Sequence, residues 1–183
     1  SFSDITIVAK DVEAYAEGIA ARNDGSGIID IKVSGRVENS STYAFSAIYT
    51  MASPASITVL ETGSIIGTAE AIHTSGTGAK NADGTYNYDK FDKADTVTVN
   101  GSVTGLNGTA ILLGGGDDTV TLGSTAKITG TIDGGTGSDT INFSVAQTSL
   151  YNFSYNETTK MAVVAIDSNE TTFKDFEYFR FSD

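Results

Sequence analysis

Two glycine-rich stretches, each containing aspartate, are the part of the sequence best suited to bind an ion. Gly134–Asn142 (GGTGSDTIN) places three glycines and an aspartate ahead of an apolar residue, and Leu113–Thr121 (LGGGDDTVT) follows the same pattern with leucine first. Glycine turns expose backbone carbonyls and aspartate adds a charged oxygen, and Ca²⁺ prefers hard oxygen ligands of both kinds. Two such loops lying one above the other could supply six or more oxygens to one ion.

The spacing predicts that three aspartates form a column. Asp118 and Asp139 are 21 residues apart, and Asp95 precedes a similar strand 23 residues before Asp118 but without glycines. A bare stack of carboxylates would repel itself, which favours a bound cation; ordinary glycine corners in which aspartate caps its own turn are the alternative. The candidate calcium ligands are Asp95, Gly114, Gly116, Asp118, Gly135, Gly137 and Asp139.

Catalytic chemistry has weaker support. His73 is the single histidine, and no G-x-S-x-G elbow accompanies it, which argues against a Ser-His-Asp triad. The pairs Asp117/Asp118 and Asp89/Asp92 could serve a glycosidase or a polysaccharide lyase. A lyase usually also needs basic residues in its groove, and here they are few and scattered. The sequence therefore leans away from an enzyme without excluding one.

A polar stretch at His73–Ala94 interrupts the regular spacing of the chain. It contains glycines and much of the local charge, which predicts a loop ejected from the body. Its aromatic residues Tyr86, Tyr88 and Phe91 could stack on sugar rings as a ligand loop, or could pack the loop onto the body. Both readings stay open from the sequence.

Short β-branched alternations recur along the chain and must position these residues. Each reads as a strand with one buried face, and a second and a third apolar position follow most of them before the next begins. From the third position to the next strand the count is 9 or 10 residues, except at the 73–94 insertion. The strands begin at Ile5, Ile29, Ile57, Val97, Val120 and Ile141.

Three short strands per period predict a coil with three sides, and stacked coils share one core. We therefore predict an all-β parallel β-helix (β-solenoid) of about five to six coils over residues 1–144, with an insertion loop at about 73–94. The stretch Asp11–Ala21 could instead be a short helix. The aromatic-rich residues 145–183 predict a C-terminal capping β-hairpin module, because an open sheet edge invites aggregation.

Composition excludes several classes of protein. The 183 residues carry 11 Lys and Arg against 23 Asp and Glu, a net charge of −12, so a nucleic-acid partner is not expected. The absence of cysteine removes disulfide scaffolds, zinc fingers and thiol catalysis. No stretch approaches 18 apolar residues, so no transmembrane segment is expected. Strong acidity without cysteine suits an exported protein.

The stretch Asp95–Phe143 resembles the β-helical passenger repeats of bacterial autotransporters and large surface adhesins. Its two glycine loops are similar to the calcium-binding (RTX-like) repeats of type I secreted proteins, although here the period is 21 residues rather than 18. Asp139–Asp183 looks like the module that follows such repeats. The resemblance implies a right-handed parallel β-helix in an extracellular or cell-surface bacterial protein.

These observations predict a structural or adhesive module that is secreted or displayed at the cell surface, stabilised by Ca²⁺. Expected partners are another copy joined end to end through the edge Ser1–Val8, as in an S-layer or fibre, neighbouring domains of a longer chain, and surface glycans. The alternative is a carbohydrate-active β-helix enzyme, a lyase or depolymerase, or a glycan-binding module.

Overall fold

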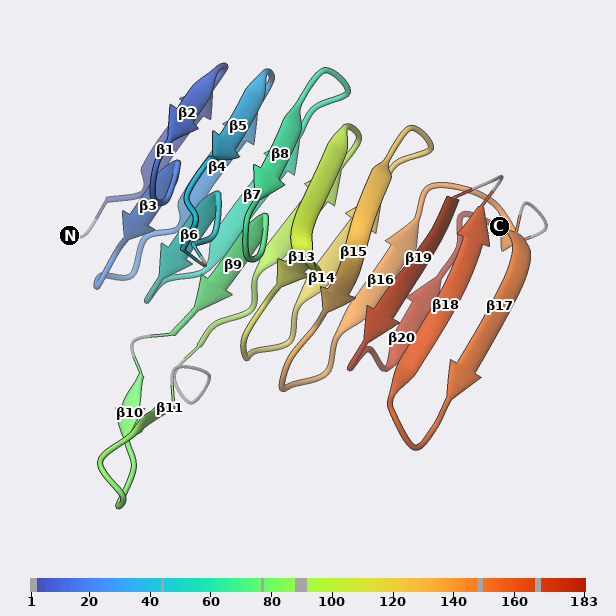
Figure 1. Ribbon diagram of the computed structural model, residues 1–183. Coiled ribbons are helices and arrows are strands. Elements are labelled where there is room, and N and C mark those ends of the chain that lie inside the picture. Colours follow the sequence, from blue (N-terminus) through green and yellow to red (C-terminus); the bar gives the residue numbers. More distant parts are fainter. Residues whose placement is uncertain (1–2, 44, 77, 88–91, 148–149, 167–168) are drawn as a thin grey trace.

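A computed structural model describes the chain except for residues 1–2, 44, 77, 88–91, 148–149 and 167–168 (Figure 1). None of the described residues lies in an α-helix, and the all-β prediction is confirmed. The stretch Asp11–Ala21 forms strand β2 and most of β3 rather than a helix. Within the described part of the chain, no helix is long and apolar enough to cross a membrane.

The first sheet stacks seven parallel strands in the order in which they occur in the chain. Apolar residues at every second position point inward, so one β-branched residue from each of the five inner strands joins a continuous buried row: Ile31, Ile57, Val97, Val120 and Ile141 are at most 1% exposed. The strands are β1 (Ile5–Ala9), β4 (Ile29–Val33), β7 (Ala55–Val59), β12 (Thr96–Val99), β14 (Thr119–Leu122), β16 (Thr140–Phe143) and β20 (Tyr178–Arg180).

The second sheet has 11 strands, eight of which form two parallel rows, while the other three belong to the C-terminal segment. Strand β13 joins the rows, because its start pairs with β8 and its end, beyond a register shift after Thr104, pairs with β9. One row contains β2 (Val12–Ala14), β5 (Arg36–Asn39), β8 (Ser64–Gly67), β13 (Ser102–Leu112) and β15 (Lys127–Asp133). The other contains β3 (Ile19–Arg22), β6 (Ile48–Met51) and β9 (Ile72–Ser75).

We call one strand from each row a layer. The strands of successive layers lie side by side across the molecule (Figure 1). Buried apolar residues of all rows form one core cluster, which also includes Val37, Ile48, Ile65, Ile72 and Val103. The predicted apolar positions therefore lie where the sequence periodicity puts them, and parallel pairing is confirmed.

The 73–94 insertion begins as a strand, because His73 belongs to β9 and pairs with Tyr49 of β6. Beyond Ser75 the chain leaves the body and forms a small antiparallel pair, β10 (Ala79–Lys80) and β11 (Tyr86–Asn87), which projects away from the sheets (Figure 1).

The C-terminal segment extends the second sheet and then returns to the first. Strands β17 (Leu150–Asn156) and β18 (Met161–Ile166) form an antiparallel hairpin, as the sequence predicts, and β18 pairs with β19 (Asn169–Lys174). Strand β19 then pairs parallel with β15, and β20 pairs parallel with β16. The tail is therefore continuous with both sheets.

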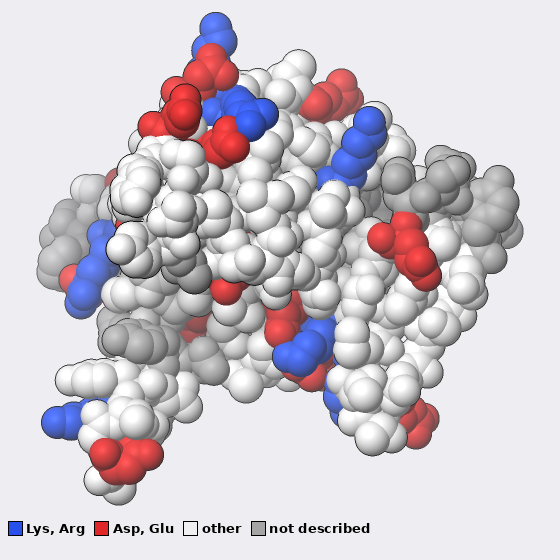
Figure 2. Space-filling model, in the orientation of Figure 1, with Lys and Arg blue, Asp and Glu red and all other residues white. Residues whose placement is uncertain are grey.

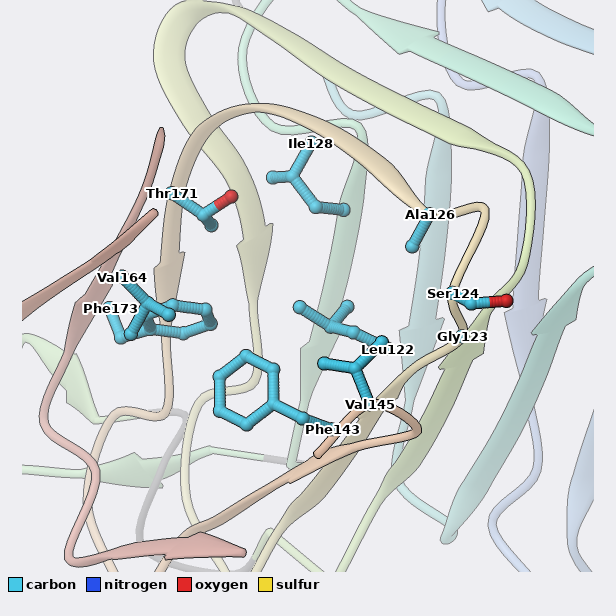
Figure 3. A pocket seen from close by; sticks show the side chains of 10 residues that line it. All are labelled: Leu122, Gly123, Ser124, Ala126, Ile128, Phe143, Val145, Val164, Thr171 and Phe173. Atoms are coloured by element: carbon cyan, nitrogen blue, oxygen red, sulfur yellow. The ribbon is translucent and has the colours of Figure 1, made fainter. Parts of the chain in front are cut away.

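Aromatic rings pack between the C-terminal segment and the preceding strands of the core. Phe173 is 1% exposed, and its ring centroid lies 5.7 Å from that of Phe143 and 5.9 Å from that of Phe179. Phe143 also stacks on Phe181 at 5.0 Å. An apolar cavity of about 50 Å³ remains beside Leu122, Phe143 and Phe173 (Figure 3). It is far below the roughly 300–1,000 Å³ of small-molecule sites, so we interpret it as a packing gap.

Candidate functional site

The in-register strands of the first sheet bring the three predicted aspartates into one row. Asp95, Asp118 and Asp139 each stand immediately before a strand, and because β12, β14 and β16 pair in register these residues are neighbours from layer to layer. Glu177 immediately precedes β20 and continues the row by one layer. We call these four residues the carboxylate column.

Each carboxylate of the column accepts a hydrogen bond from a backbone N–H in the layer before it. Ala55 N donates to Asp95 Oδ1 at 2.6 Å and Asp95 N donates to Asp118 Oδ1 at 2.6 Å. Asp118 N donates to Asp139 Oδ1 at 2.8 Å, and Asp139 N donates to Glu177 Oε2 at 2.8 Å. The column is therefore a chain of side-chain-to-backbone bonds that spans five layers, from Ala55 to Glu177.

The same position is satisfied differently in the first layers. Ile5 N donates to the carbonyl oxygen of Ile28, and Ile29 N donates to that of Pro54, both at 2.9 Å. The later layers thus use a side-chain carboxylate where the earlier layers use a backbone carbonyl. Because a buried N–H without an acceptor is costly, this substitution gives the carboxylates a structural role that needs no ligand.

The second oxygen of each aspartate is in a different situation. Asp95, Asp118 and Asp139 are at most 2% exposed, and their Oδ2 atoms are buried without a hydrogen-bond partner among the described residues. Burial is the main cause that raises the pKa of Asp95 to about 7, of Asp118 to about 9 and of Asp139 to about 6. Neighbouring carboxylates of the column add to the rise at Asp118. Each Oδ2 is therefore a place for a proton or a cation.

The two glycine loops stack on each other, as the sequence predicts. Gly114, Gly116, Gly135 and Gly137 all have positive φ, and Gly115 bridges to Thr136. A Cβ on Gly137 would overlap the carbonyl oxygen of Gly116, so the loops can approach only without side chains there. The carbonyls of Gly114 and Thr136 accept N–H groups across the interface, at 2.8 and 2.9 Å.

The acidic side chains beside the column are used in other ways. Asp117 Oδ1 accepts the Ser138 N–H at 3.0 Å, and Asp92 Oδ2 accepts the Gly115 N–H at 3.1 Å. Lys174 Nζ contacts Asp133 Oδ2 at 2.7 Å. Asp117 is exposed and accepts the Ser138 N–H, whereas Asp118 is buried and accepts the Asp95 N–H, so the two carboxylates are used separately. Asp89, the partner proposed for Asp92, lies outside the described residues.

The oxygen atoms of the carboxylate column meet only part of what a cation site requires. Buried carboxylate oxygens without partners are suitable ligands, but the column spaces them one per layer, and in the described residues no three His, Cys, Asp or Glu side chains gather as a metal site. A Ca²⁺ ion there would have to draw its remaining ligands from backbone carbonyls of the glycine loops or from water.

A groove on the outer side of β3, β6 and β9 was not predicted from the sequence. Its volume is about 450 Å³. Register aligns Glu17, Ser46 and Glu70 in one row, two residues before the paired residues Ile19, Ile48 and Ile72. The groove, which we call the Glu70 groove, is lined by Glu17, Phe45, Ser46, Tyr49, Ala69, Glu70 and His73.

The predicted ligand loop is only partly described. Tyr86 belongs to β11 and is 57% exposed, which is consistent with an accessible ring. Tyr88 and Phe91 lie outside the described residues. Figure 2 shows acidic and basic atoms in small separate groups on the face in view, with most of that face uncharged and no broad basic patch.

Comparison of the chain with models of protein families, with curated proteins and with solved structures finds no match.

Proposed function

We propose that the protein is an extracellular structural or adhesive module of the bacterial cell surface, built as a right-handed parallel β-helix. The observation that supports this most directly is the set of parallel rows that run in register through the molecule around one apolar core. Seven strands of the first sheet, at about 4.8 Å per step, span roughly 29 Å. Such a stack is stiff, and its outer faces are free to carry binding sites.

Location is the first test of this proposal. Antibodies raised against the purified chain should label intact, non-permeabilised cells of the organism that encodes it, or should detect the protein in the culture medium. Beads coated with the chain should also be retained on isolated cell envelopes more than beads coated with an unrelated acidic protein. Detection only in the soluble intracellular fraction would overturn the proposal.

We further propose that Ca²⁺ stabilises the stack at the carboxylate column. The supporting observation is the row of buried Oδ2 atoms without partners beside two glycine loops. A cation there would replace the protons that the raised pKa values favour. This predicts a higher Tm in millimolar Ca²⁺ than in EGTA, with the difference larger at pH 8 than at pH 5 because protons compete with the ion. An unchanged Tm at both pH values would exclude a stabilising calcium site.

A further inference from the structure

We propose that the Glu70 groove binds a short saccharide that is neutral or carries amino groups. This inference rests on the proposed adhesive function and names the ligand class that one face of the stack would recognise. It moves glycan recognition from the loop containing Tyr86 to the outer surface of β3, β6 and β9, where side chains from three successive layers line one groove.

The groove has the dimensions of a ligand site. Its volume of about 450 Å³ falls within the roughly 300–1,000 Å³ typical of such sites, unlike the cavity beneath the C-terminal segment. It is open to solvent, so a short saccharide could enter without a change in the backbone. Two adjacent rows of side chains line the groove, because Tyr49 pairs with His73 across β6 and β9. One row is Glu17, Ser46 and Glu70, and the other is Tyr49 and His73.

The polar side chains of the groove are held in place before any ligand arrives. Ser46 Oγ donates to Glu70 Oε2 at 2.9 Å, and His73 Nδ1 lies 3.8 Å from the same oxygen. The Tyr49 hydroxyl lies 2.9 Å from Ser75 Oγ, and its ring meets the His73 ring edge-on at 5.1 Å. A site whose side chains are already fixed loses less entropy on binding than a mobile one.

The Glu70 carboxylate is at the same time reachable by a ligand. Its side chain is 25% exposed and that of His73 is 29% exposed, and both face the groove. A carboxylate that is partly buried and partly accessible can accept hydrogen bonds from sugar hydroxyls, or pair with an amino group, at the edge of an aromatic surface.

The chemistry of the lining disfavours anions, metal ions and purely apolar molecules as ligands. Two carboxylates in a chain of net charge −12 disfavour anions, including uronic acids and phosphates. Metal ions are disfavoured because the described side chains bring together no three acidic or histidine ligands. A purely apolar ligand would leave Glu17, Glu70 and Ser46 without water. Sugar rings satisfy the whole lining, since their C–H faces suit Phe45 and Tyr49 and their hydroxyls suit the carboxylates.

Binding of defined trisaccharides by the whole chain tests this inference. We would titrate N-acetylglucosamine trimer and cellotriose (neutral), glucosamine trimer (cationic) and galacturonic acid trimer (anionic) by calorimetry and by saturation-transfer NMR. At least one neutral or cationic trimer should bind with a Kd on the order of 1 mM or tighter, and the anionic trimer should not bind.

Variants locate the binding. Tyr49→Ala and Glu70→Gln should each weaken binding at least tenfold, whereas Tyr49→Phe, which keeps the ring, should retain most of it. The matched controls Tyr155→Ala and Glu157→Gln, on the C-terminal hairpin, should bind like the parent chain. Circular dichroism must show that each variant is folded, and Tyr49→Phe together with Glu70→Gln keeps the test valid if Tyr49→Ala unfolds.

The inference is overturned if no neutral or cationic trimer binds, if the anionic trimer binds best, or if the controls lose binding as strongly as the groove variants. These outcomes leave the proposed function standing, because surface labelling and bead retention are measured without saccharides. Conversely, an intracellular location would refute the adhesive role even if the groove bound a trimer.

Discussion

At the scale of single residues, the aspartates of the carboxylate column take the place of backbone carbonyls as hydrogen-bond acceptors. Asp118 accepts the amide of Asp95 through one oxygen and leaves the other oxygen buried without a partner in the described part of the chain. One oxygen thus continues the pattern that the carbonyls of Ile28 and Pro54 set in earlier layers. The other oxygen is buried without a partner among the described residues, and this burial disfavours the charged carboxylate and raises the pKa of Asp118.

Replacing Asp118 separates these two roles. Asp118→Asn keeps an acceptor for the Asp95 N–H and removes the ionisable group, so its free energy of unfolding at pH 7 in EGTA should stay within about 1 kcal/mol of the parent. Asp118→Ala leaves a buried N–H without an acceptor and should cost about 1–3 kcal/mol. Urea denaturation measures both values. Equal losses in the two variants would show that an acceptor for the Asp95 N–H is not what the fold needs at this position.

The column also predicts how stability depends on pH. The folded-state pKa values of Asp95, Asp118 and Asp139, about 7, 9 and 6, exceed the value of about 3.9 for an unfolded aspartate. Between pH 4 and pH 9 the folded state therefore binds more protons, and stability is fully present at the acidic end and declines as pH rises. We expect the calcium-free chain to lose at least about 2 kcal/mol between pH 5 and pH 9.

Denaturation at several pH values in EGTA measures this slope. The variant Asp118→Asn should show a shallower decline, because it lacks the group with the highest pKa in the column. Stability that rises from pH 5 to pH 9 would contradict the predicted protonation of the column.

At the scale of the elements, the glycine corners decide how closely layers stack. Gly137→Ala introduces a Cβ that overlaps the Gly116 carbonyl at a positive φ, and should cost more than about 3 kcal/mol or prevent folding. Gly84→Ala is the matched control, because Gly84 also has positive φ but faces open space; it should cost about 1–2 kcal/mol. Thermal melting compares the two, and similar losses would show that stacking of the loops contributes nothing.

The C-terminal segment is the element that closes the core. Phe173 is fully buried and its ring contacts those of Phe143, Phe176 and Phe179. Phe173→Ala should destabilise the chain by about 3–5 kcal/mol, since it removes a large side chain beside an existing cavity. Tyr178→Ala removes an aromatic ring that is 51% exposed and should change stability little. Chemical denaturation of both variants would reveal a loosely attached segment if Phe173→Ala proved equally harmless.

Strands were predictable from sequence because β-branched alternation marks them directly: Ile29, Ile57 and Val97 begin or lie in strands that pair as expected. Glu177 was not predictable, since the hairpin makes it 38 residues distant from Asp139, well outside the period of about 21. The Glu70 groove was hidden for a similar reason. Glu17, Ser46 and Glu70 are separated by unequal lengths of chain, and only the pairing of β3, β6 and β9 aligns them.

At the scale of the whole molecule, the first sheet ends at β1, which pairs with β4 on one side and with no described strand on the other. Ile5 donates its N–H toward β4, so alternation directs the N–H of Thr6 and Val8 to the open side, where Val8 is 72% exposed. Such an edge favours pairing with another strand, and the charge of −12 opposes it at low salt.

This edge predicts salt-dependent association. Sedimentation velocity should show growth of larger species as salt rises from 20 to about 500 mM, where the Debye length falls well below 10 Å. Thr6→Pro removes one outward donor without breaking a bond to β4 and should reduce association while leaving Tm within a few degrees. A parent chain that remains monomeric at high salt would exclude end-to-end assembly through β1.

The bonds of the carboxylate column all run in one direction: every acceptor belongs to a later layer than the amide it receives. Backbone bonds at the same junctions run the other way, because Thr119 N donates to Asp95 O, Thr140 N to Asp118 O and Tyr178 N to Asp139 O. Each of these junctions is therefore closed by a reciprocal pair of bonds, one through a carboxylate and one through a backbone carbonyl. An aspartate of the column thus ties its own layer to both neighbours, to the earlier one through its side chain and to the later one through its carbonyl.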